Sequence, residues 1–187
     1  MFCFLECCIL TLEPLLFKNT YIVNGFKAND ERGWFAKNFQ QDEYSRLGLN
    51  FTCKETFFSW SKCGVLRGMH FQMPPHAQNK IVTCLSGTVL DVLLDLRKSS
   101  PHYGKSVCVE LNGEASRSIF VPLGVAHGFI VLSDEALLGY QTSTAHNSNS
   151  DTGIQWNSFG FDWPSDSPIV SKRDANLPLF SEFSSPF

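Results

Sequence analysis

The sequence lacks an apolar run long enough to cross a membrane, and it lacks any excess of positive charge. A membrane-spanning helix needs roughly 18 or more consecutive apolar residues, and no stretch of the chain approaches that length. The 187 residues include 15 Lys and Arg against 18 Asp and Glu, a formal net charge of −3. Such a chain has no overall basic field with which to hold nucleic acid. We therefore expect a protein that binds neither a membrane nor nucleic acid.

The cysteines lack the spacing of a disulfide framework or of a structural zinc site. There are seven, an odd number, and no Cys-x-x-Cys pair occurs. Disulfide-bonded and zinc-bound domains usually show paired cysteines at short spacings. We therefore expect a reducing, cytoplasmic compartment. Cys84 and Cys108 lie in apolar runs, and we interpret both as small core residues.

The first ten residues, MFCFLECCIL, are apolar but do not resemble a secretion signal. They include Glu6, and they lack the positively charged start and the small-residue cleavage site that such a signal carries. We interpret residues 1–17 as a strand or arm that pairs with another strand.

The length and composition predict one globular domain over residues 1–187. Hydrophobic residues make up 43% of the chain and charged residues 18%, so a sizeable core can be buried. Short apolar or alternating runs between turn residues indicate strands. These runs cover residues 10–17, 20–26, 51–61, 81–85, 89–96, 106–111, 118–121, 129–132 and 136–142.

Helices are expected to contribute little. One short helix is predicted over residues 39–47, ended by Gly48, and the tail over residues 157–187 is rich in Pro and Ser and should wrap the sheet as loops and short turns. Strands do not alternate with long helices, which argues against a doubly wound fold. Ser86-Gly87 predicts a tight turn between two strands. The pattern favours an antiparallel barrel or sandwich.

A short motif narrows the fold further. Residues 122–127, PLGVAH, follow an apolar strand, and Pro-x-Gly-x-x-His is the second motif of the cupin jelly roll. The metal ligands that often accompany this fold are incomplete here. Gln72 stands where a second histidine would follow His70, and Val131 stands where the second motif would carry its last polar residue. The sequence therefore predicts no metal site.

Further motifs occur in one order along the chain. They are residues 30–35 (DERGWF), 64–72 (GVLRGMHFQ), 78–80 (QNK), 86–92 (SGTVLDV), 95–101 (DLRKSSP), 122–129 (PLGVAHGF), 140–142 (YQT), 154–156 (IQW), 161–164 (FDWP) and 171–174 (SKRD). Together they resemble the dTDP-4-dehydrorhamnose 3,5-epimerases, over about residues 10–180. The resemblance implies an all-β fold, the cupin double-stranded β-helix or jelly roll, with short peripheral helices. It also implies a nucleotide-sugar substrate.

The chemistry of such a family makes definite demands on side chains. Epimerising a carbon beside a ketone needs a base on one face of the sugar, an acid on the other, and a group that stabilises the enolate charge. Histidine, whose ordinary pKa lies near neutrality, suits the base, and His70 is the candidate. The resemblance implies that Asp174 pairs with His70, that Tyr140 is the acid and that Lys80 stabilises the oxyanion. No cofactor is expected.

The resemblance also implies a set of substrate contacts. Arginines suit a diphosphate because a guanidinium group binds phosphate through two hydrogen bonds, and Phe35 suits stacking on the base. The arginines are Arg32, Arg67 and Arg173, and further contacts are implied for Ser59, Gln72, His127 and Asp151.

Arg67 and His70 raise a geometric difficulty. They are three residues apart, so a regular strand would direct them to opposite sides. Either Gly68 marks a bulge that turns both inward, or Arg67 belongs to the site of a partner subunit.

Several positions depart from the family pattern. Lys37 replaces the usual glutamate, Glu55 and Phe57 stand where a Gln-x-Asn stretch is usual, and Asp151 replaces a glutamate. Gln141 stands where a lysine is common. By resemblance, Lys37, Glu55 and Phe57 lie near the nucleotide base, so both the nucleotide and the number of carbons epimerised stay open.

Other functions are compatible with the same fold. They are a 3-epimerase or 3,4-ketoisomerase acting on a CDP-, GDP- or UDP-linked sugar, a non-catalytic sugar-binding cupin, and a metal-dependent cupin enzyme. The joint presence of His70, Lys80, Tyr140 and Asp174 argues against mere binding, because a binding module needs no paired acid and base. The resemblance further implies a homodimer that exchanges its N-terminal strand.

Overall fold

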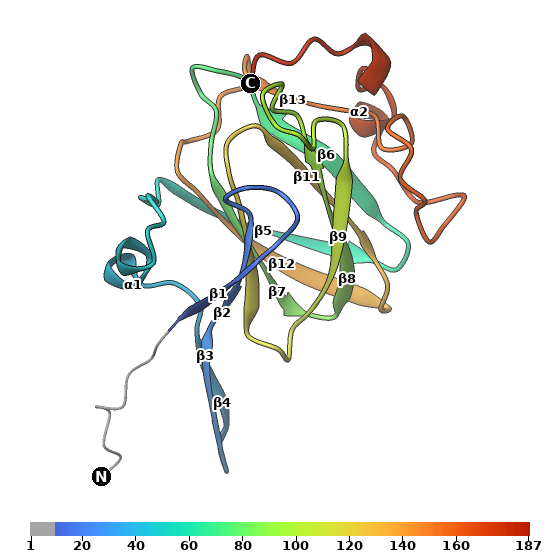
Figure 1. The fold of residues 1–187 in the computed structure, drawn as a ribbon. Helices are drawn as coiled ribbons and strands as arrows, with labels where there is room; N and C mark the ends of the chain where they lie inside the picture. Colours follow the sequence, from blue (N-terminus) through green and yellow to red (C-terminus); the bar gives the residue numbers. More distant parts are fainter. Residues whose placement is uncertain (1–9) are drawn as a thin grey trace.

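The computed structural model describes residues 10–187, which form two antiparallel sheets and a separate hairpin (Figure 1). One sheet has the strand order β1-β2-β10-β7-β12-β5, the other has the order β13-β6-β11-β8-β9, and β3 pairs with β4. The strands are β1 (Thr11–Pro14), β2 (Tyr21–Asn24), β3 (Phe26–Asp30), β4 (Gly33–Lys37), β5 (Glu55–Lys62), β6 (Leu66–Gln72), β7 (Lys80–Ser86), β8 (Thr88–Asp95), β9 (Ser106–Asn112), β10 (Arg117–Val121), β11 (Val125–Val131), β12 (Glu135–Thr142) and β13 (Asp151–Gly153). The helices are α1 (Gln41–Arg46), α2 (Lys172–Ala175) and the 3₁₀ turn η1 (Phe180–Glu182). None of the helices within residues 10–187 has the length and apolar character needed to span a membrane.

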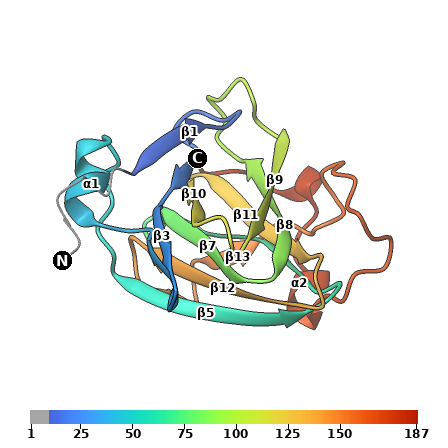
Figure 2. The same ribbon diagram turned by 90° about the horizontal axis from the view of Figure 1, so that it is seen from below.

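Consecutive strands from β5 onward mostly lie in different sheets, which is the jelly-roll pattern. β7 belongs to the six-stranded sheet and β8 to the five-stranded one, so the predicted turn at Ser86-Gly87 carries the chain across the sandwich and does not close a hairpin. Gly87 has a φ of 78°, and a Cβ there would lie 2.0 Å from the Glu135 carbonyl oxygen, so this crossing requires glycine. Seen from below, the two sheets enclose a common interior (Figure 2). The predicted cupin jelly roll is confirmed.

The interior core follows from the alternation of the strands. Buried side chains from both sheets, among them Val82, Leu93 and Phe129, meet between the layers. Along β12 the inward residues change from Ala136 and Leu138 to Tyr140, which reaches the cavity described below. The strand pattern therefore places polar chemistry at one end of an otherwise apolar interior.

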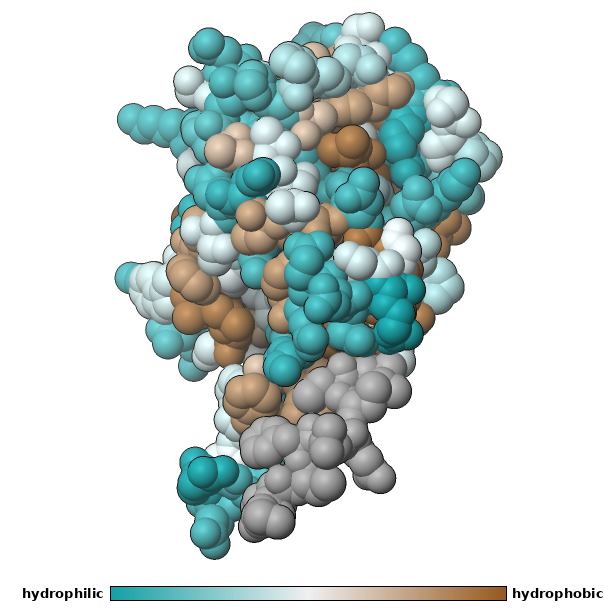
Figure 3. Space-filling model, turned by 90° about the vertical axis from the view of Figure 1, so that its left-hand side faces the viewer, coloured by the Kyte–Doolittle hydropathy of each residue, from teal (hydrophilic) through white to brown (hydrophobic). Residues whose placement is uncertain are grey.

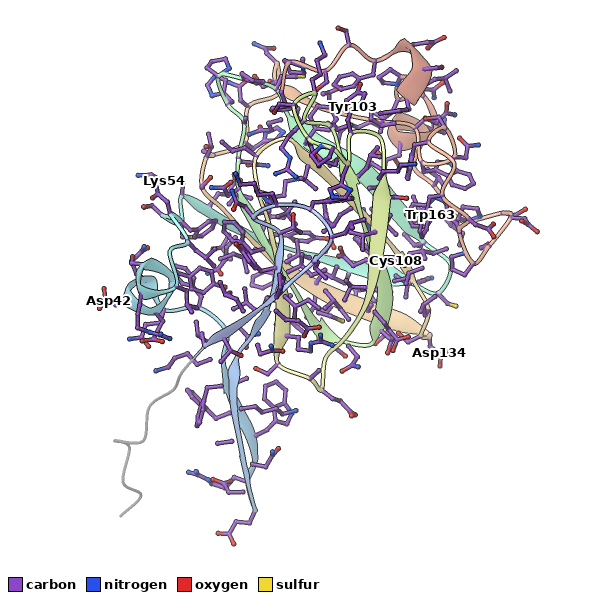
Figure 4. The ribbon with its side chains drawn as sticks, in the orientation of Figure 1. Asp42, Lys54, Tyr103, Cys108, Asp134 and Trp163 are labelled. Atoms are coloured by element: carbon purple, nitrogen blue, oxygen red, sulfur yellow. The ribbon has the colours of Figure 1, made fainter. Side chains whose placement is uncertain are left out.

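The outer faces are covered by the parts of the chain that lie outside the jelly roll. Aromatic residues of the tail, including Trp163 (Figure 4), Phe183 and Phe187, pack on the outward side chains of β6, such as Phe71. These contacts place aromatic residues of the tail on the outer face of the five-stranded sheet. On the other side, α1 buries Tyr44 against the end of the six-stranded sheet.

Some sequence-based expectations are wrong in detail. Cys84 is buried, but Cys108 faces solvent from the edge strand β9 (Figure 4), because the alternation of that strand directs it outward with Glu110. The strand expected over residues 10–17 is restricted to β1, because the chain turns back at residues 15–20 to pair β1 with β2. The helix expected over residues 39–47 is confirmed as α1. Residues 1–9, with Cys3, Cys7, Cys8 and much of the expected arm, lie outside the described residues.

Candidate active site

A cavity of about 310 Å³ opens between the two sheets at the polar end of the interior. Most of the side chains proposed from the sequence line it, although their elements are far apart in the chain. The lining residues are Glu55, Phe57, Ser59, Arg67, His70, Gln78, Lys80, His127, Phe129, Tyr140, His146, Asp151 and Arg173.

One wall carries a histidine paired with a carboxylate. His70 projects from β6, and its Nε2 lies 2.8 Å from Oδ1 of Asp174 in α2. The other carboxylate oxygen of Asp174 accepts the Gly68 N–H at 3.1 Å, and the Ser171 hydroxyl caps α2 by accepting the Asp174 N–H. Burial favours the neutral carboxyl, but the hydrogen bonds from His70 and the Gly68 N–H, with the nearby charge of Arg173, together outweigh it and hold the pKa of Asp174 below its usual value. An ionised Asp174 orients the ring so that Nε2–H donates to it, which leaves on Nδ1 a lone pair that can accept a proton.

Arg67 lines the same cavity as His70 because β6 contains a bulge. His127 of β11 is paired with His70, whereas Phe129 is paired with Arg67, so three residue steps on β6 face two on β11. The extra residue is accommodated at Gly68, whose φ is 142° and where a Cβ would lie 2.5 Å from the Gly128 Cα. Of the two explanations left open by the sequence, the structure therefore favours the bulge.

The opposite sheet supplies a buried phenol. Tyr140 projects from β12, is 7% exposed, and its hydroxyl lies 3.1 Å from the Ser59 hydroxyl on β5. Burial raises the pKa of Tyr140 well above its usual value, so the phenol stays protonated at neutral pH. The protonated phenol of Tyr140 and the imidazole of His70 thus lie on opposite sheets of one cavity, as a proton donor and a proton acceptor would.

Lys80 is the first residue of β7 and is only 8% exposed. Its ammonium donates to the carbonyl oxygen of His70 at 3.2 Å, which places it beside the base. Desolvation lowers the pKa of Lys80 to about 8, although the charge of Asp151 opposes this shift. The lysine is thus a cation near neutrality, ready to stabilise negative charge on a nearby oxygen.

We expect kcat/KM to fall as the pH rises through about 8, because Lys80 is charged below its pKa and neutral above it. A pH–rate profile of Lys80→Arg provides the comparison, since a guanidinium group keeps its charge and should move this alkaline limb upward. Lys62→Arg, at an exposed position on β5, should leave the profile unchanged. An alkaline limb at the same pH in the wild type and in Lys80→Arg would contradict the assignment.

A second histidine–aspartate pair lies on the neighbouring strands. His127 Nε2 is 2.7 Å from Oδ2 of Asp91, and both side chains are buried. Among the described residues, nothing bonds to the other oxygen of Asp91. Burial raises the pKa of Asp91, and the nearby His127 opposes that shift. The sequence reasoning did not single out Asp91, although a carboxylate inside the apolar run at residues 89–96 is the signal that could have identified it.

The side chains at the mouth of the cavity are polar, and ion pairs link several of them. Asp151 lies 2.7 Å from the Arg173 guanidinium and 3.4 Å from His146 Nε2. Glu55 accepts the His146 N–H at 2.7 Å. His146 and Gln78 were not proposed from the sequence. Gln78 lies in one of the motifs, but His146 stands in a Ser- and Asn-rich loop whose pattern gives no signal.

Four of the proposed substrate contacts do not line this cavity. Gln72 is buried beside it and joins loops, donating to the His76 carbonyl oxygen and accepting the Asn147 N–H. Arg32, Phe35 and Lys37 belong to the β3–β4 hairpin, which projects from the body (Figure 1). Within residues 10–187, no three His, Cys, Asp or Glu residues are placed to hold a metal ion.

The fold is a cupin jelly roll whose interior holds a carboxylate-paired histidine and a buried tyrosine on opposing sheets, an arrangement suited to an epimerase of the cupin class. The family model described as dTDP-4-dehydrorhamnose 3,5-epimerase matches residues 15–182, and the chain belongs to this family. The family membership predicted from the sequence is therefore confirmed.

Individual relatives agree over most of their lengths. The dTDP-4-dehydrorhamnose 3,5-epimerase of Shigella flexneri is 40% identical over 175 residues, covering 92% of this chain and 91% of the relative. A dTDP-4-dehydrorhamnose 3-epimerase of Streptomyces niveus is 32% identical over 176 residues, with 92% and 85% covered. The crystal structure of a dTDP-6-deoxy-D-glucose-3,5-epimerase from Legionella pneumophila, in complex with dTDP-4-keto-L-rhamnose, superposes with a TM-score of 0.89 at 34% identity, covering 94% of this chain and 95% of that one.

Proposed function

We propose that this protein epimerises a dTDP-linked 4-keto-6-deoxy sugar inside the cavity. The observation that carries the proposal is the placement of the His70–Asp174 pair and of Tyr140 on opposite sheets that face one cavity. A planar enolate held between the two sheets would face His70 on one side and Tyr140 on the other. Inversion requires that the proton be removed from one face and returned to the opposite face.

The reaction follows from these positions. His70 Nδ1 takes the proton from the carbon beside the ketone, and the electron pair of that C–H bond moves into the ketone, whose oxygen becomes negative. Lys80 stabilises this oxyanion. Tyr140 gives its phenolic proton to the same carbon from the other face, so the ketone re-forms and the centre is inverted. A proton from solvent then restores Tyr140, and His70 releases the proton that it took.

The mouth of the cavity suits the nucleotide part of the substrate. Arg67 and Arg173 both line the cavity, and guanidinium groups bind a diphosphate through paired charged hydrogen bonds. Glu55 is an acidic side chain at the mouth, and a carboxylate accepts a hydrogen bond from a ring donor but donates none to a ring acceptor, so Glu55 bears on which base is preferred.

The experiment is proton NMR in deuterated water with 4-keto-6-deoxy sugars linked to dTDP, UDP, CDP and GDP. We expect solvent deuterium at C3, at C5 or at both, fastest with the dTDP compound, together with the epimerised product. The positions labelled also decide between a 3-epimerase and a 3,5-epimerase. Turnover without deuterium uptake, or binding without turnover, would contradict the proposal.

We further propose that the protein works in the cytoplasm as a homodimer. Large apolar side chains lie exposed on the outer face of the six-stranded sheet (Phe58 and Trp60) and on the hairpin (Trp34 and Phe35). In Figure 3, brown apolar patches lie on the body, and the end of the projecting hairpin is hydrophilic. Exposed apolar patches of this kind commonly mark an interface. A second copy seated there would cover these apolar side chains, and β1 at a sheet edge is open to strand exchange. Sedimentation velocity over a range of protein concentrations tests the dimer.

A further inference from the structure

The ring of Tyr140 is held by another aromatic ring that the reaction scheme does not use. Phe57 on β5 is paired directly with Tyr140 on β12. Their ring centroids are 4.6 Å apart and their planes are inclined by only 12°, a stacked arrangement. Tyr140 is therefore covered on one face by a ring that belongs to the edge strand of the sheet.

The same strand also holds the phenolic hydroxyl. Ser59 lies two residues beyond Phe57, so both side chains point to the same face of β5, and its hydroxyl lies 3.1 Å from that of Tyr140. The His127 ring also approaches Tyr140 in an edge-on arrangement, with centroids 6.2 Å apart. The phenol is thus fixed in rotation by Phe57 and His127 and fixed at its oxygen by Ser59.

Phe57 is poorly explained as a core residue. It is 41% exposed and lines the cavity, whereas the core beneath it is already closed by fully buried side chains. Its neighbour Phe58 is 63% exposed on the opposite face of β5. A partly exposed aromatic ring in a polar cavity stabilises the fold less than a buried ring does. The stacking of Phe57 on Tyr140 therefore needs an explanation other than core packing.

We infer that Phe57 is a positioning residue for Tyr140, and that its stacking sets how often the enolate is protonated from the tyrosine side rather than from the histidine side. This inference rests on the proposed function. Protonation from Tyr140 inverts the carbon, whereas protonation by His70 restores the original configuration and leaves only exchange with solvent. A small misplacement of a proton donor has a large effect on transfer, because the transfer requires close and aligned atoms.

The test measures the ratio of inverted product to substrate that has gained deuterium without inversion. Both processes begin with the same proton abstraction by the same folded molecules, so the ratio does not depend on how much of a variant is folded. In Phe57→Leu, which lacks a flat ring, we expect the ratio to fall roughly tenfold. Phe57→Tyr keeps a ring that can stack and should restore it. Phe159→Leu removes a ring that stacks on Phe161 in the tail and does not line the cavity; it is the matched control and should leave the ratio unchanged.

A spectroscopic readout checks the cause. With ¹³C-labelled tyrosine, the ring signal of Tyr140 is assigned by its disappearance in Tyr140→Phe, and Phe57→Leu should move it as the ring current of Phe57 is lost. Should Phe57→Leu fail to fold, Phe57→Met removes the flat ring at similar volume, and the same ratio decides. If the wild type epimerises, and the ratio in Phe57→Leu or in Phe57→Met is within twofold of the wild-type ratio, only this inference is overturned. A wild type without exchange on any of the nucleotide sugars instead contradicts the proposed function and, with it, this inference.

Discussion

His70→Ala should lower both deuterium uptake and product formation by about 10³-fold or more, because it removes the group that takes the proton. The ring is held by Asp174 at 2.8 Å and lies in the cavity with Lys80. The other two imidazoles that line the cavity, His127 and His146, pair with Asp91 and Asp151 instead. The measurement is proton NMR in deuterated water with the dTDP-linked 4-keto-6-deoxy sugar. Asp174→Asn should reduce both rates less severely, because the histidine remains but loses the partner that orients it.

The control for this prediction is another histidine of the same chain. His76→Ala removes an imidazole that does not line the cavity, and it should leave both rates close to those of the wild type. A wild-type rate of exchange in His70→Ala would exclude His70 as the base and would require a different group on that wall.

Tyr140→Phe should separate exchange from inversion. It removes only the hydroxyl that lies 3.1 Å from Ser59, and the ring that stacks on Phe57 stays. Proton abstraction by His70 does not need that hydroxyl, so deuterium uptake should persist, whereas formation of inverted product should fall by about 10²-fold or more. The two rates are followed together in one NMR time course.

A surface tyrosine provides the matched comparison for this variant. Tyr103, labelled in Figure 4, packs its ring on Phe180 of the tail and does not line the cavity, so Tyr103→Phe should change neither rate. Equal losses of exchange and inversion in Tyr140→Phe would show that this phenol takes part in abstraction, and the assignment of a separate acid would be wrong.

The sequence predicted the structure best where the order of apolar, polar and turn residues determines a single strand. The alternation over residues 106–111 predicted β9, and the turn residues predicted the ends of most other strands. The sheet that each strand joins was not predictable in the same way, because the Ser86-Gly87 turn suits a hairpin as well as a crossing between sheets. The strand β6 was hard to recognise because glycine and polar residues interrupt its apolar pattern.

The sequence predicted which residues form most of the candidate site, but it did not predict how they are arranged in space. The motifs nominated His70 and Asp174, but 104 positions separate them, and only the packing of the tail brings them together. Gln72 belongs to a motif, yet it is used to join loops, since its amide can both donate and accept. Asp91 was missed because no pattern in the sequence relates it to His127, which lies 36 positions later.

The docking of α2 has a consequence for how the protein is made. His70, Lys80, His127 and Tyr140 all belong to strands of the jelly roll, whereas Asp174 comes after them on a helical turn of four residues. During synthesis the chain leaves the ribosome from its N-terminus, so the strands can assemble while the carboxylate that orients the base is still absent. A nascent or prematurely ended chain lacks Arg173 as well as Asp174, because the same helix carries both. Under the proposed mechanism, the contact to the diphosphate and the orientation of the base are therefore completed together, as the last segment of the newly made chain docks.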